Sequence, residues 1–234
     1  MSLDVFPILC NAGFMNNYAY LLIETQSRKT AIVDASEAGP IIKACVYHHV
    51  EPEYILVTHH HDDHTGANAE LKAKYNLKIV APEAEKELIE GADILLKDGD
   101  IFDFGKTSAE IISAAGHTRG HILWYFKKDK ALFTGDVLFN LSIGGLFEGT
   151  PKQMWNTLEK IKALPDDVRF YCGHEYTAFG LSGLPDNDAG AEYFNLVKPL
   201  IEKSYPTVGM SLGLEKKCNP YLRVSSLEEF ENLF

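Results

Sequence analysis

The sequence predicts a β-rich α/β body over residues 1–176, followed by a small, mainly helical extension over residues 177–234. Up to residue 176, short runs of β-branched and aromatic residues alternate with segments of helical periodicity. After residue 176 comes a loop rich in Gly, Pro and Asp, and then a single helical segment. The 234 residues, 46% of them hydrophobic, are enough for one large domain with an appendage.

In the first part of the body, apolar and β-branched runs predict strands. These strands cover residues 5–9, 18–24, 30–33, 54–57 and 78–81. Helical character over residues 40–49 places a helix between the third and fourth strands. Thr65 is the expected N-cap of a second helix. Pro82 begins a third, because proline suits the first helical turn.

The second part of the body is richer in strands, and an Asp-Gly-Asp turn at residues 98–100 precedes them. The expected strands cover residues 109–114, 122–126, 131–133 and 168–172. Between the last two, Thr150 and Pro151 supply an N-cap and a first-turn proline for an amphipathic helix. A further helix is expected at residues 189–204, within the extension.

The charge balance limits the partners of this protein. With 33 acidic and 22 basic residues, its formal net charge is −11, which repels nucleic-acid phosphates and disfavours a nucleic-acid substrate, so we expect no nucleic-acid partner. No run approaches the roughly 20 apolar residues of a membrane span, so we expect no membrane association. The four cysteines form no CxxC pair, which favours reduced thiols and a cytoplasmic location. No feature indicates an obligate protein partner.

The histidines are unevenly distributed, and four of the nine fall within residues 59–64. This cluster directly follows a predicted buried strand, where extended backbone would project His59 and His61 to the same side. Asp63 and His64 follow on the bend into the next helix. Imidazole and carboxylate donors without thiolate suit Zn, Fe or Mn. Taken alone, the cluster could also be a chance polar surface loop.

Three further loops carry possible ligands, and each follows an apolar strand. Their candidate residues are His117 and His121 in the first, Asp136 in the second and His174 in the third. A lone histidine is usually a surface residue or a hydrogen-bonded residue of the core, and a lone Asp after Gly is usually part of a turn. Four such loops in one chain are difficult to attribute to turns alone, so we predict a metal centre.

The order of these motifs resembles that of the metallo-β-lactamase superfamily. The motifs are HxHxDH at residues 59–64, GHTxGH at 116–121, TGD at 134–136 and GHEYT at 173–177. Within the superfamily, three segments are similar to glyoxalase II, the hydroxyacylglutathione hydrolases: GHEYT, FEGT at residues 147–150 and the C-terminal segment 206–224. The resemblance implies a four-layer αββα sandwich as the catalytic domain (1–176) and a helical substrate-binding extension (177–234).

The resemblance also implies two divalent metal ions, with zinc as the first expectation and iron or manganese compatible. The implied ligands are His59, His61 and His117 for one ion, Asp63, His64 and His174 for the other, and Asp136 between them. Asp63 would also orient the bridging hydroxide, so Asp63 and Asp136 are the expected catalytic residues. Two such ions would activate water and polarise a thioester carbonyl, and the thiolate leaves readily.

Three residues outside this set are candidates for supporting roles. Asp34 follows a buried strand and could either orient a ligand or cap a turn. His60 is expected to face solvent, because it points away from its neighbours in extended backbone. His121 could fix the orientation of a ligating histidine.

The substrate implied by the family is a glutathione thioester, such as S-D-lactoylglutathione, which is cleaved to glutathione and a hydroxy acid. The expected substrate contacts are Gly145, Phe147, His174 and Tyr176. Gly145 stands where glutathione-specific members carry a basic residue, and the chain ends in an acidic segment instead of a basic one. Fewer cationic partners should weaken recognition of the glutathione carboxylates. Lys216 and Lys217 are possible substitutes.

Three alternatives remain open from the sequence. A related hydrolase could act on another thioester or a lactone. A persulfide dioxygenase would use one iron and oxygen, although the complete second ligand set favours hydrolysis. A non-enzymatic metal-binding protein on the same scaffold is the third alternative.

Overall fold

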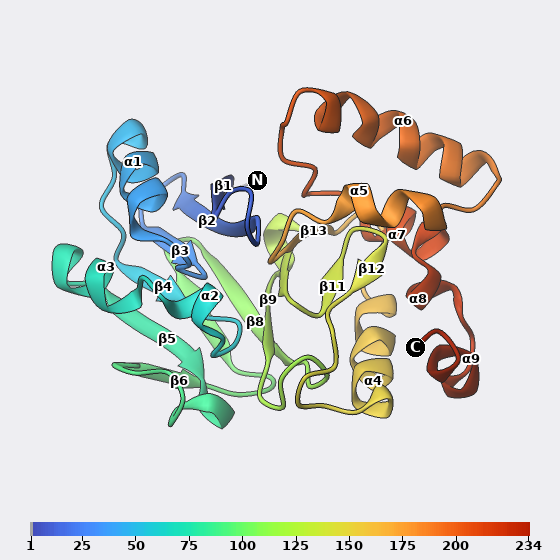
Figure 1. Ribbon diagram of the computed structural model, residues 1–234. Helices are drawn as coiled ribbons and strands as arrows, with labels where there is room; N and C mark the ends of the chain where they lie inside the picture. Colours follow the sequence, from blue (N-terminus) through green and yellow to red (C-terminus); the bar gives the residue numbers. More distant parts are fainter. Residues whose placement is uncertain (1) are drawn as a thin grey trace.

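The computed structural model describes residues 2–234. Two β-sheets pack face to face, and helices cover the outer surface of each sheet (Figure 1). The chain therefore forms the four-layer αββα sandwich with a helical C-terminal region that the sequence predicts.

The first sheet has six strands in the spatial order β1-β2-β3-β4-β5-β6. Its strands are β1 (Leu3–Cys10), β2 (Asn17–Glu24), β3 (Thr30–Val33), β4 (Tyr54–Leu56), β5 (Lys78–Pro82) and β6 (Ile94–Leu96). The first three pair antiparallel, and β3 to β6 pair parallel. Parallel neighbours need crossover connections, which here contain α1 (Ala38–His48), α2 (Asp62–Thr65) and α3 (Asn68–Tyr75).

The second sheet has five strands in the order β13-β10-β9-β8-β7. They are β7 (Ile101–Phe104), β8 (Thr107–Ser113), β9 (Ile122–Phe126), β10 (Ala131–Gly135) and β13 (Arg169–Cys172). Between β10 and β13 lie the short hairpin strands β11 (Leu138–Phe139) and β12 (Ser142–Ile143), followed by helix α4 (Pro151–Lys162). Thr150 and Gln153 form a reciprocal capping box at the start of α4, as the Thr-Pro signal predicts.

Three apolar clusters hold the layers together. Between the sheets, Leu22, Val33 and Leu56 of the first sheet meet Trp124 and Phe133 of the second, all essentially inaccessible to water. A second cluster lies between the first sheet and helices α1 and α3, and a third between the second sheet, α4 and the C-terminal helices. Both sheets are thus buried on two faces, which explains the continuous apolar runs of β2 and β9.

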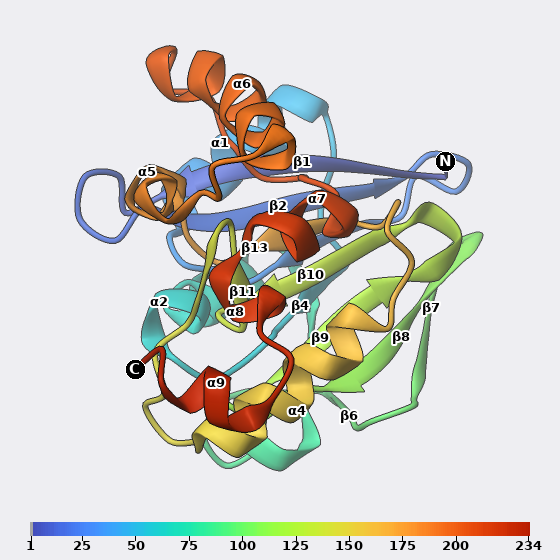
Figure 2. The ribbon, with the colours of Figure 1, turned by 90° about the vertical axis from the view of Figure 1, so that its right-hand side faces the viewer.

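The C-terminal region is helical (Figure 2). Its elements are α5 (Thr177–Gly180), the 3₁₀ turn η3 (Leu181–Gly183), α6 (Asp188–Glu202), α7 (Leu212–Cys218), α8 (Pro220–Arg223) and α9 (Leu227–Glu231). Helices α7, α8 and α9 pack beside α4 and β13, and the longer α6 packs on α7. The last three helices occupy a segment expected to be irregular. Ser211, Asn219 and Ser226 cap them, and such single-residue caps are weak signals in a sequence without long apolar periodicity.

A buried carboxylate connects this region to the body. Glu215 of α7 accepts hydrogen bonds from the backbone N–H of Leu141, from Asn219 Nδ2 (2.9 Å) and from the Tyr193 hydroxyl (2.9 Å). Burial raises the pKa of Glu215 to about 7. The folded protein therefore keeps a proton that the unfolded chain releases near pH 4.5. Stability falls as pH rises through this window, because the folded state must then hold a buried charge.

Replacing Glu215 by Gln is expected to remove this pH dependence. Gln can still accept from Leu141 N–H and donate to the Tyr193 hydroxyl, so the network survives without the buried charge. The free energy of unfolding of Glu215→Gln relative to wild type should increase by about 2–3 kcal/mol between pH 4.5 and pH 8, as measured by urea denaturation. Glu192→Gln, an exposed change on α6, is the control. A difference between Glu215→Gln and wild type that is constant with pH would contradict the prediction.

Two local expectations differ from the structure. Thr65 does not begin a helix: it ends α2, and its hydroxyl donates to the carbonyls of His60 and His61, because residues 62–65 form a helical turn of their own. Pro82 precedes only the single 3₁₀ turn η1 (Glu83–Glu85), after which the chain passes to β6. Strands β6 and β7 were not anticipated, because they have only three and four residues and lie on either side of the turn at residues 98–100.

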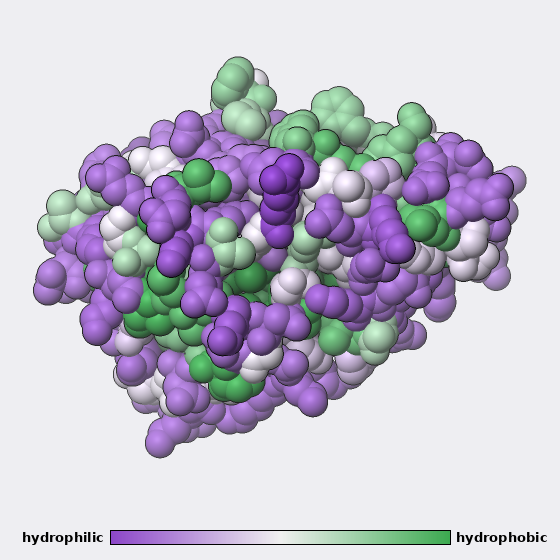
Figure 3. Space-filling model, turned by 90° about the horizontal axis from the view of Figure 1, so that it is seen from below, coloured by the Kyte–Doolittle hydropathy of each residue, from purple (hydrophilic) through white to green (hydrophobic). Residues whose placement is uncertain are grey.

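The surface seen from below is mainly hydrophilic, with a group of hydrophobic residues on the side of β6 (Figure 3). Among residues 2–234, no helix combines the length and apolar character needed to cross a bilayer.

Candidate metal centre

Four loops bring the seven candidate ligands to one place at the ends of the two sheets. The loop after β4 carries residues 59–64, and the loop between β8 and β9 carries His117. Asp136 follows β10, and His174 follows β13. Strands from both sheets thus deliver side chains to a common edge, where their loops meet. The side chains form two clusters, and Asp136 lies between them.

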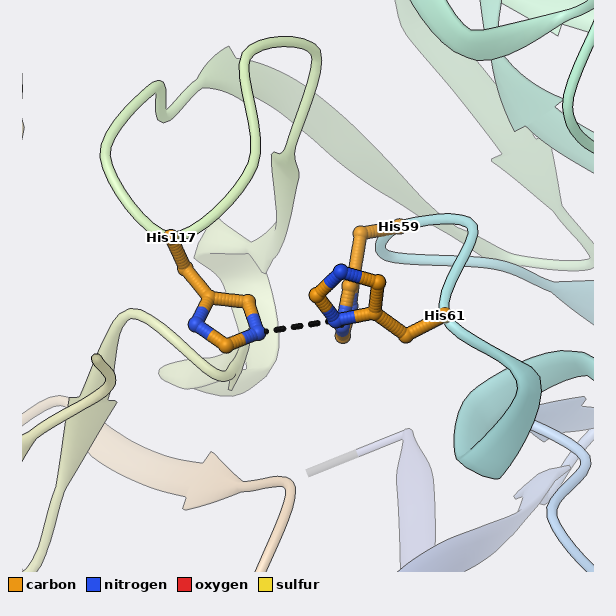
Figure 4. Close-up of side chains that lie close together, drawn as sticks. All are labelled: His59, His61 and His117. Atoms are coloured by element: carbon orange, nitrogen blue, oxygen red, sulfur yellow. Dashed lines mark hydrogen bonds between the residues drawn. The ribbon is translucent and has the colours of Figure 1, made fainter. Parts of the chain in front are cut away.

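The first cluster consists of three histidines (Figure 4). His61 Nδ1 lies 3.2 Å from His59 Nε2 and 3.0 Å from His117 Nε2. His59 and His117 are buried, whereas His61 is partly open to solvent. Three imidazole nitrogens that face a common point are the donor set of a zinc site with room for a further ligand.

The second cluster consists of Asp63, His64 and His174. Asp63 Oδ2 lies 3.3 Å from His174 Nε2 and 3.5 Å from His64 Nε2. Asp136 contacts both clusters: its Oδ1 is 3.2 Å from His64 Nε2, and its Oδ2 is 3.1 Å from His174 Nε2 and 3.5 Å from His117 Nε2. A single carboxylate could therefore serve two cations.

Hydrogen bonds on the outer side of the rings fix their tautomers. His117 Nδ1 donates to the carbonyl of Gly145 (2.7 Å), and His174 Nδ1 donates to the carbonyl of Met15 (2.9 Å). His64 Nδ1 donates to Asp34 Oδ2 (3.0 Å). In each ring, Nε2 is the nitrogen that faces the centre, which is how protein metal sites orient ligating histidines.

Asp34 supports the second cluster directly, through His64, and the first cluster through Thr58. Besides binding His64, it accepts hydrogen bonds from the backbone N–H and the hydroxyl of Thr58, each at 2.8 Å. The Thr58 hydroxyl has only this one proton to donate, so its oxygen accepts from His59 Nδ1, 3.0 Å away. Asp34 has a positive φ of 51°, a conformation that Asp tolerates better than most residues. Of the two roles considered for Asp34, orienting a ligand fits this geometry.

Charge and burial set the protonation of the centre. Burial lowers the pKa of His59 far below its usual value. At His174 burial acts in the same direction, but the Asp136 carboxylate overcomes it and raises the pKa to about 9. The pKa of Asp136 lies well below its usual range despite burial, because His64 and His174 face it. Without a metal, the second cluster thus holds protons, which a cation would displace.

Two buried polar atoms without a hydrogen-bond partner indicate that the centre fits cations. His64 Nε2 and Asp136 Oδ1 are buried and form no hydrogen bond, although they lie 3.2 Å apart. Buried polar atoms are otherwise almost always paired. Gly173 leaves the space that Asp136 needs, because a Cβ there would come 2.1 Å from Asp136 Oδ1. Carboxylate and imidazole donors of this kind suit two divalent ions, and the residues present fit such a group.

The other expected residues lie around this centre. Phe147 is 73% exposed, and its ring centroid is 5.0 Å from that of His117. Tyr176 stacks on His174 with 4.8 Å between ring centroids. Gly145 is exposed and holds His117 through its carbonyl. His121 is buried, stacks on His59, and its Nε2 accepts from the backbone N–H of Asp136 (3.3 Å).

The structure changes the expectations for two side chains. His60 does not face solvent freely: its Nδ1 lies 3.0 Å from Glu85 Oε2, and its Nε2 lies 3.2 Å from Glu148 Oε1. Its loop folds back against η1, so the alternation expected of extended backbone does not hold. Lys216 is engaged elsewhere, since its Nζ donates to Asp166 Oδ1 and to the carbonyl of Leu164, both at 2.6 Å.

Sequence reasoning also missed Asn17, which is fully buried at the start of β2. Its side-chain Nδ2 donates to Asp63 Oδ2 (2.9 Å) and to the Asp63 carbonyl (3.0 Å). Asn17 therefore holds one of the candidate ligands in place. An isolated Asn before a strand has no motif that could reveal this role.

The αββα sandwich and this donor set define a metallohydrolase of the metallo-β-lactamase type. The profile of the Metallo-beta-lactamase superfamily matches residues 12–174, and that of the Hydroxyacylglutathione hydrolase C-terminus matches residues 175–232. The crystal structure of TTHA1623 in a di-iron-bound form has a TM-score of 0.68 to this chain and is 25% identical, with 93% of this chain and 100% of that chain covered.

Curated relatives narrow the class. The chain is 40% identical over 222 residues to the hydroxyacylglutathione hydrolase of Pelagibacter ubique (strain HTCC1062), with 93% of both chains covered. It is 42% identical over 217 residues to that of Methylococcus capsulatus, with 91% of this chain and 85% of the relative covered. The chain belongs to the hydroxyacylglutathione hydrolase, or glyoxalase II, family.

Proposed function

We propose that this protein hydrolyses S-(2-hydroxyacyl)glutathione, with S-D-lactoylglutathione as the expected substrate, to glutathione and a hydroxy acid. The names of the curated relatives support the substrate. The position of Asp136 supports the chemistry most directly, because its two oxygens face nitrogens of separate clusters. A thioester also needs no strong acid to expel its thiolate, which suits a centre built from metal ligands.

The seven candidate ligands would hold two divalent ions, for which zinc is the first candidate. One ion would be bound by His59, His61 and His117, the other by Asp63, His64 and His174, and both by Asp136. When bound, such a pair of ions lowers the pKa of water and polarises the carbonyl of the substrate. The four cysteines are buried and unpaired, which fits the cytoplasmic location expected for the protein.

The chain's own groups orient the reactants. Asn17 fixes Asp63 through Oδ2, so that Asp63 Oδ1 remains to accept a hydrogen bond from the attacking water. Water adds its oxygen to the thioester carbonyl carbon, the C–S bond breaks, and the thiolate leaves with the electron pair. The proton that the water loses on attack would be taken up by Asp63 and passed on to the thiolate, so that a carboxylic acid and a thiol are the products. Phe147, beside His117, and Tyr176, on His174, would flank the substrate from opposite clusters. We propose residues 177–234 as the substrate-binding extension that follows Tyr176.

The Gly145→Lys variant tests glutathione recognition. A cation at this exposed position is expected to lower KM for S-D-lactoylglutathione about fivefold with little change in kcat, because glutathione carries carboxylates. Gly145→Met is the matched control. Both variants place a Cβ 3.1 Å from the Phe147 ring, so their difference reports the charge alone. Equal KM values for the two variants would contradict glutathione binding at this position.

Thiol release from S-D-lactoylglutathione tests the reaction itself. The metal-reconstituted protein should release glutathione, and the chelated protein should not. A persulfide dioxygenase would instead consume oxygen with glutathione persulfide and hold a single iron. Oxygen uptake without thioester hydrolysis would overturn the proposal. Hydrolysis only of thioesters that lack glutathione, or only of lactones, would keep the reaction class and reject the substrate.

A further inference from the structure

A buried carboxylate outside the ligand set joins two of the loops at the centre. Glu85 ends the 3₁₀ turn η1, and its side chain is 3% exposed. Its Oε2 accepts hydrogen bonds from His60 N (2.7 Å) and faces His60 Nδ1 (3.0 Å). Its Oε1 accepts from Gly120 N (3.0 Å) and from the Thr118 hydroxyl. No lysine or arginine pairs with Glu85 in residues 2–234, so these donors alone stabilise its charge.

The donors come from the two loops that supply the first cluster. His60 stands between His59 and His61, and Thr118 directly follows His117. Gly120 permits the close approach, because a Cβ there would come 2.5 Å from Glu85 Cγ. One side chain therefore links the histidine pair on one loop to the third histidine on the other.

We propose that Glu85 is a positioning residue that sets the separation between His117 and the His59–His61 pair. The proposal rests on the proposed metal centre. This role requires a carboxylate at residue 85, because one oxygen faces two groups of the first loop, His60 N and His60 Nδ1, and the other faces two groups of the second loop, Gly120 N and the Thr118 hydroxyl. A Gln at this position has the same shape but presents an NH2 group to one of these pairs, which leaves buried donors without an acceptor.

The Glu85→Gln variant tests this role through metal affinity. Competitive chelation of the zinc-loaded protein should show one of the two ions bound about 10–100-fold more weakly than in wild type, with the other little changed. Hydrolysis should fall with occupancy of the weakened site. Glu83→Gln is the matched control, because Glu83 belongs to the same 3₁₀ turn but is exposed. This variant should bind both ions as wild type does.

Three outcomes would overturn the proposal. In the first, Glu85→Gln binds both ions with wild-type affinity. In the second, the variant binds both ions equally weakly, and the melting temperature of the metal-free protein is lower. In the third, the wild-type protein binds no zinc. If Glu85→Gln does not fold, Thr118→Val, which removes one donor, should weaken the same single ion to a smaller extent, and unchanged affinity would refute the role. A wild-type protein that binds two ions but leaves the thioester intact would refute the proposed substrate only, since affinity alone decides the role of Glu85.

Discussion

The Asp136→Asn variant is expected to lose at least about 100-fold in kcat/KM for thioester hydrolysis. Asp136 is the carboxylate that faces both clusters, and its charge is unshielded by solvent because it is only 6% exposed. Residues that merely support a metal ligand already contribute 10–100-fold, so the loss of a group shared by two ions should exceed that range. Thiol release and metal content per chain, measured on the same preparation, provide the test.

An exposed aspartate offers the control for this change. Asp103→Asn removes one negative charge from an exposed position on the edge strand β7 and should leave kcat/KM within a factor of two. In the metal-free protein, Asp136→Asn should also lower the pKa of His174 from about 9, because the carboxylate is the group that raises it. Nuclear magnetic resonance titration would detect this shift. Near-wild-type hydrolysis by Asp136→Asn would refute the bridging role.

The Asp34→Asn variant is expected to weaken metal binding about 10–100-fold and to lower hydrolysis accordingly. Asn can still accept from the backbone N–H of Thr58, but its NH2 group replaces the oxygen that holds His64 Nδ1 and the Thr58 hydroxyl. Because His64 belongs to one cluster and Thr58 orients His59 of the other, both ions should be affected. This pattern differs from the single weakened ion expected for Glu85→Gln.

Competitive chelation measures the effect of Asp34→Asn. Asp62→Asn is a suitable control, because Asp62 lies on α2 within the same loop region but is exposed. That variant should retain wild-type affinity. Unchanged binding of both ions by Asp34→Asn would show that Asp34 serves the turn after β3 rather than the ligands.

The sequence predicted the parts of this molecule that depend on local patterns. The strands β4, β10 and β13, which precede three of the four ligand loops, are rich in apolar residues, and Thr150 with Pro151 is a local capping signal. The motif HxHxDH brings four candidate ligands together within six residues, and GHEYT marks His174, so the residue types could be found without knowing the fold. Short elements such as β6 and α8 have few residues and depend on tertiary packing for their conformation.

Asp34 and His121 were found from the sequence as candidates for supporting roles, whereas Asn17 and Glu85 were not, because they act across long separations in the chain. Asn17 contacts Asp63 46 residues away, and Glu85 contacts Gly120 35 residues away. Neither residue lies in a motif, and in the sequence neither can be told apart from an ordinary polar residue of the surface. The expectation for His60 was wrong for the same reason, since η1 folds against a loop that local geometry alone would leave open.

The most direct measurement is a titration of the metal-free protein with zinc, in which hydrolysis of S-D-lactoylglutathione is followed against ions bound per chain. A centre that uses both clusters predicts that activity reaches its plateau only at two ions per chain. It also predicts no measurable activity without metal. A plateau at one ion per chain, or hydrolysis by the metal-free protein, would contradict the binuclear centre.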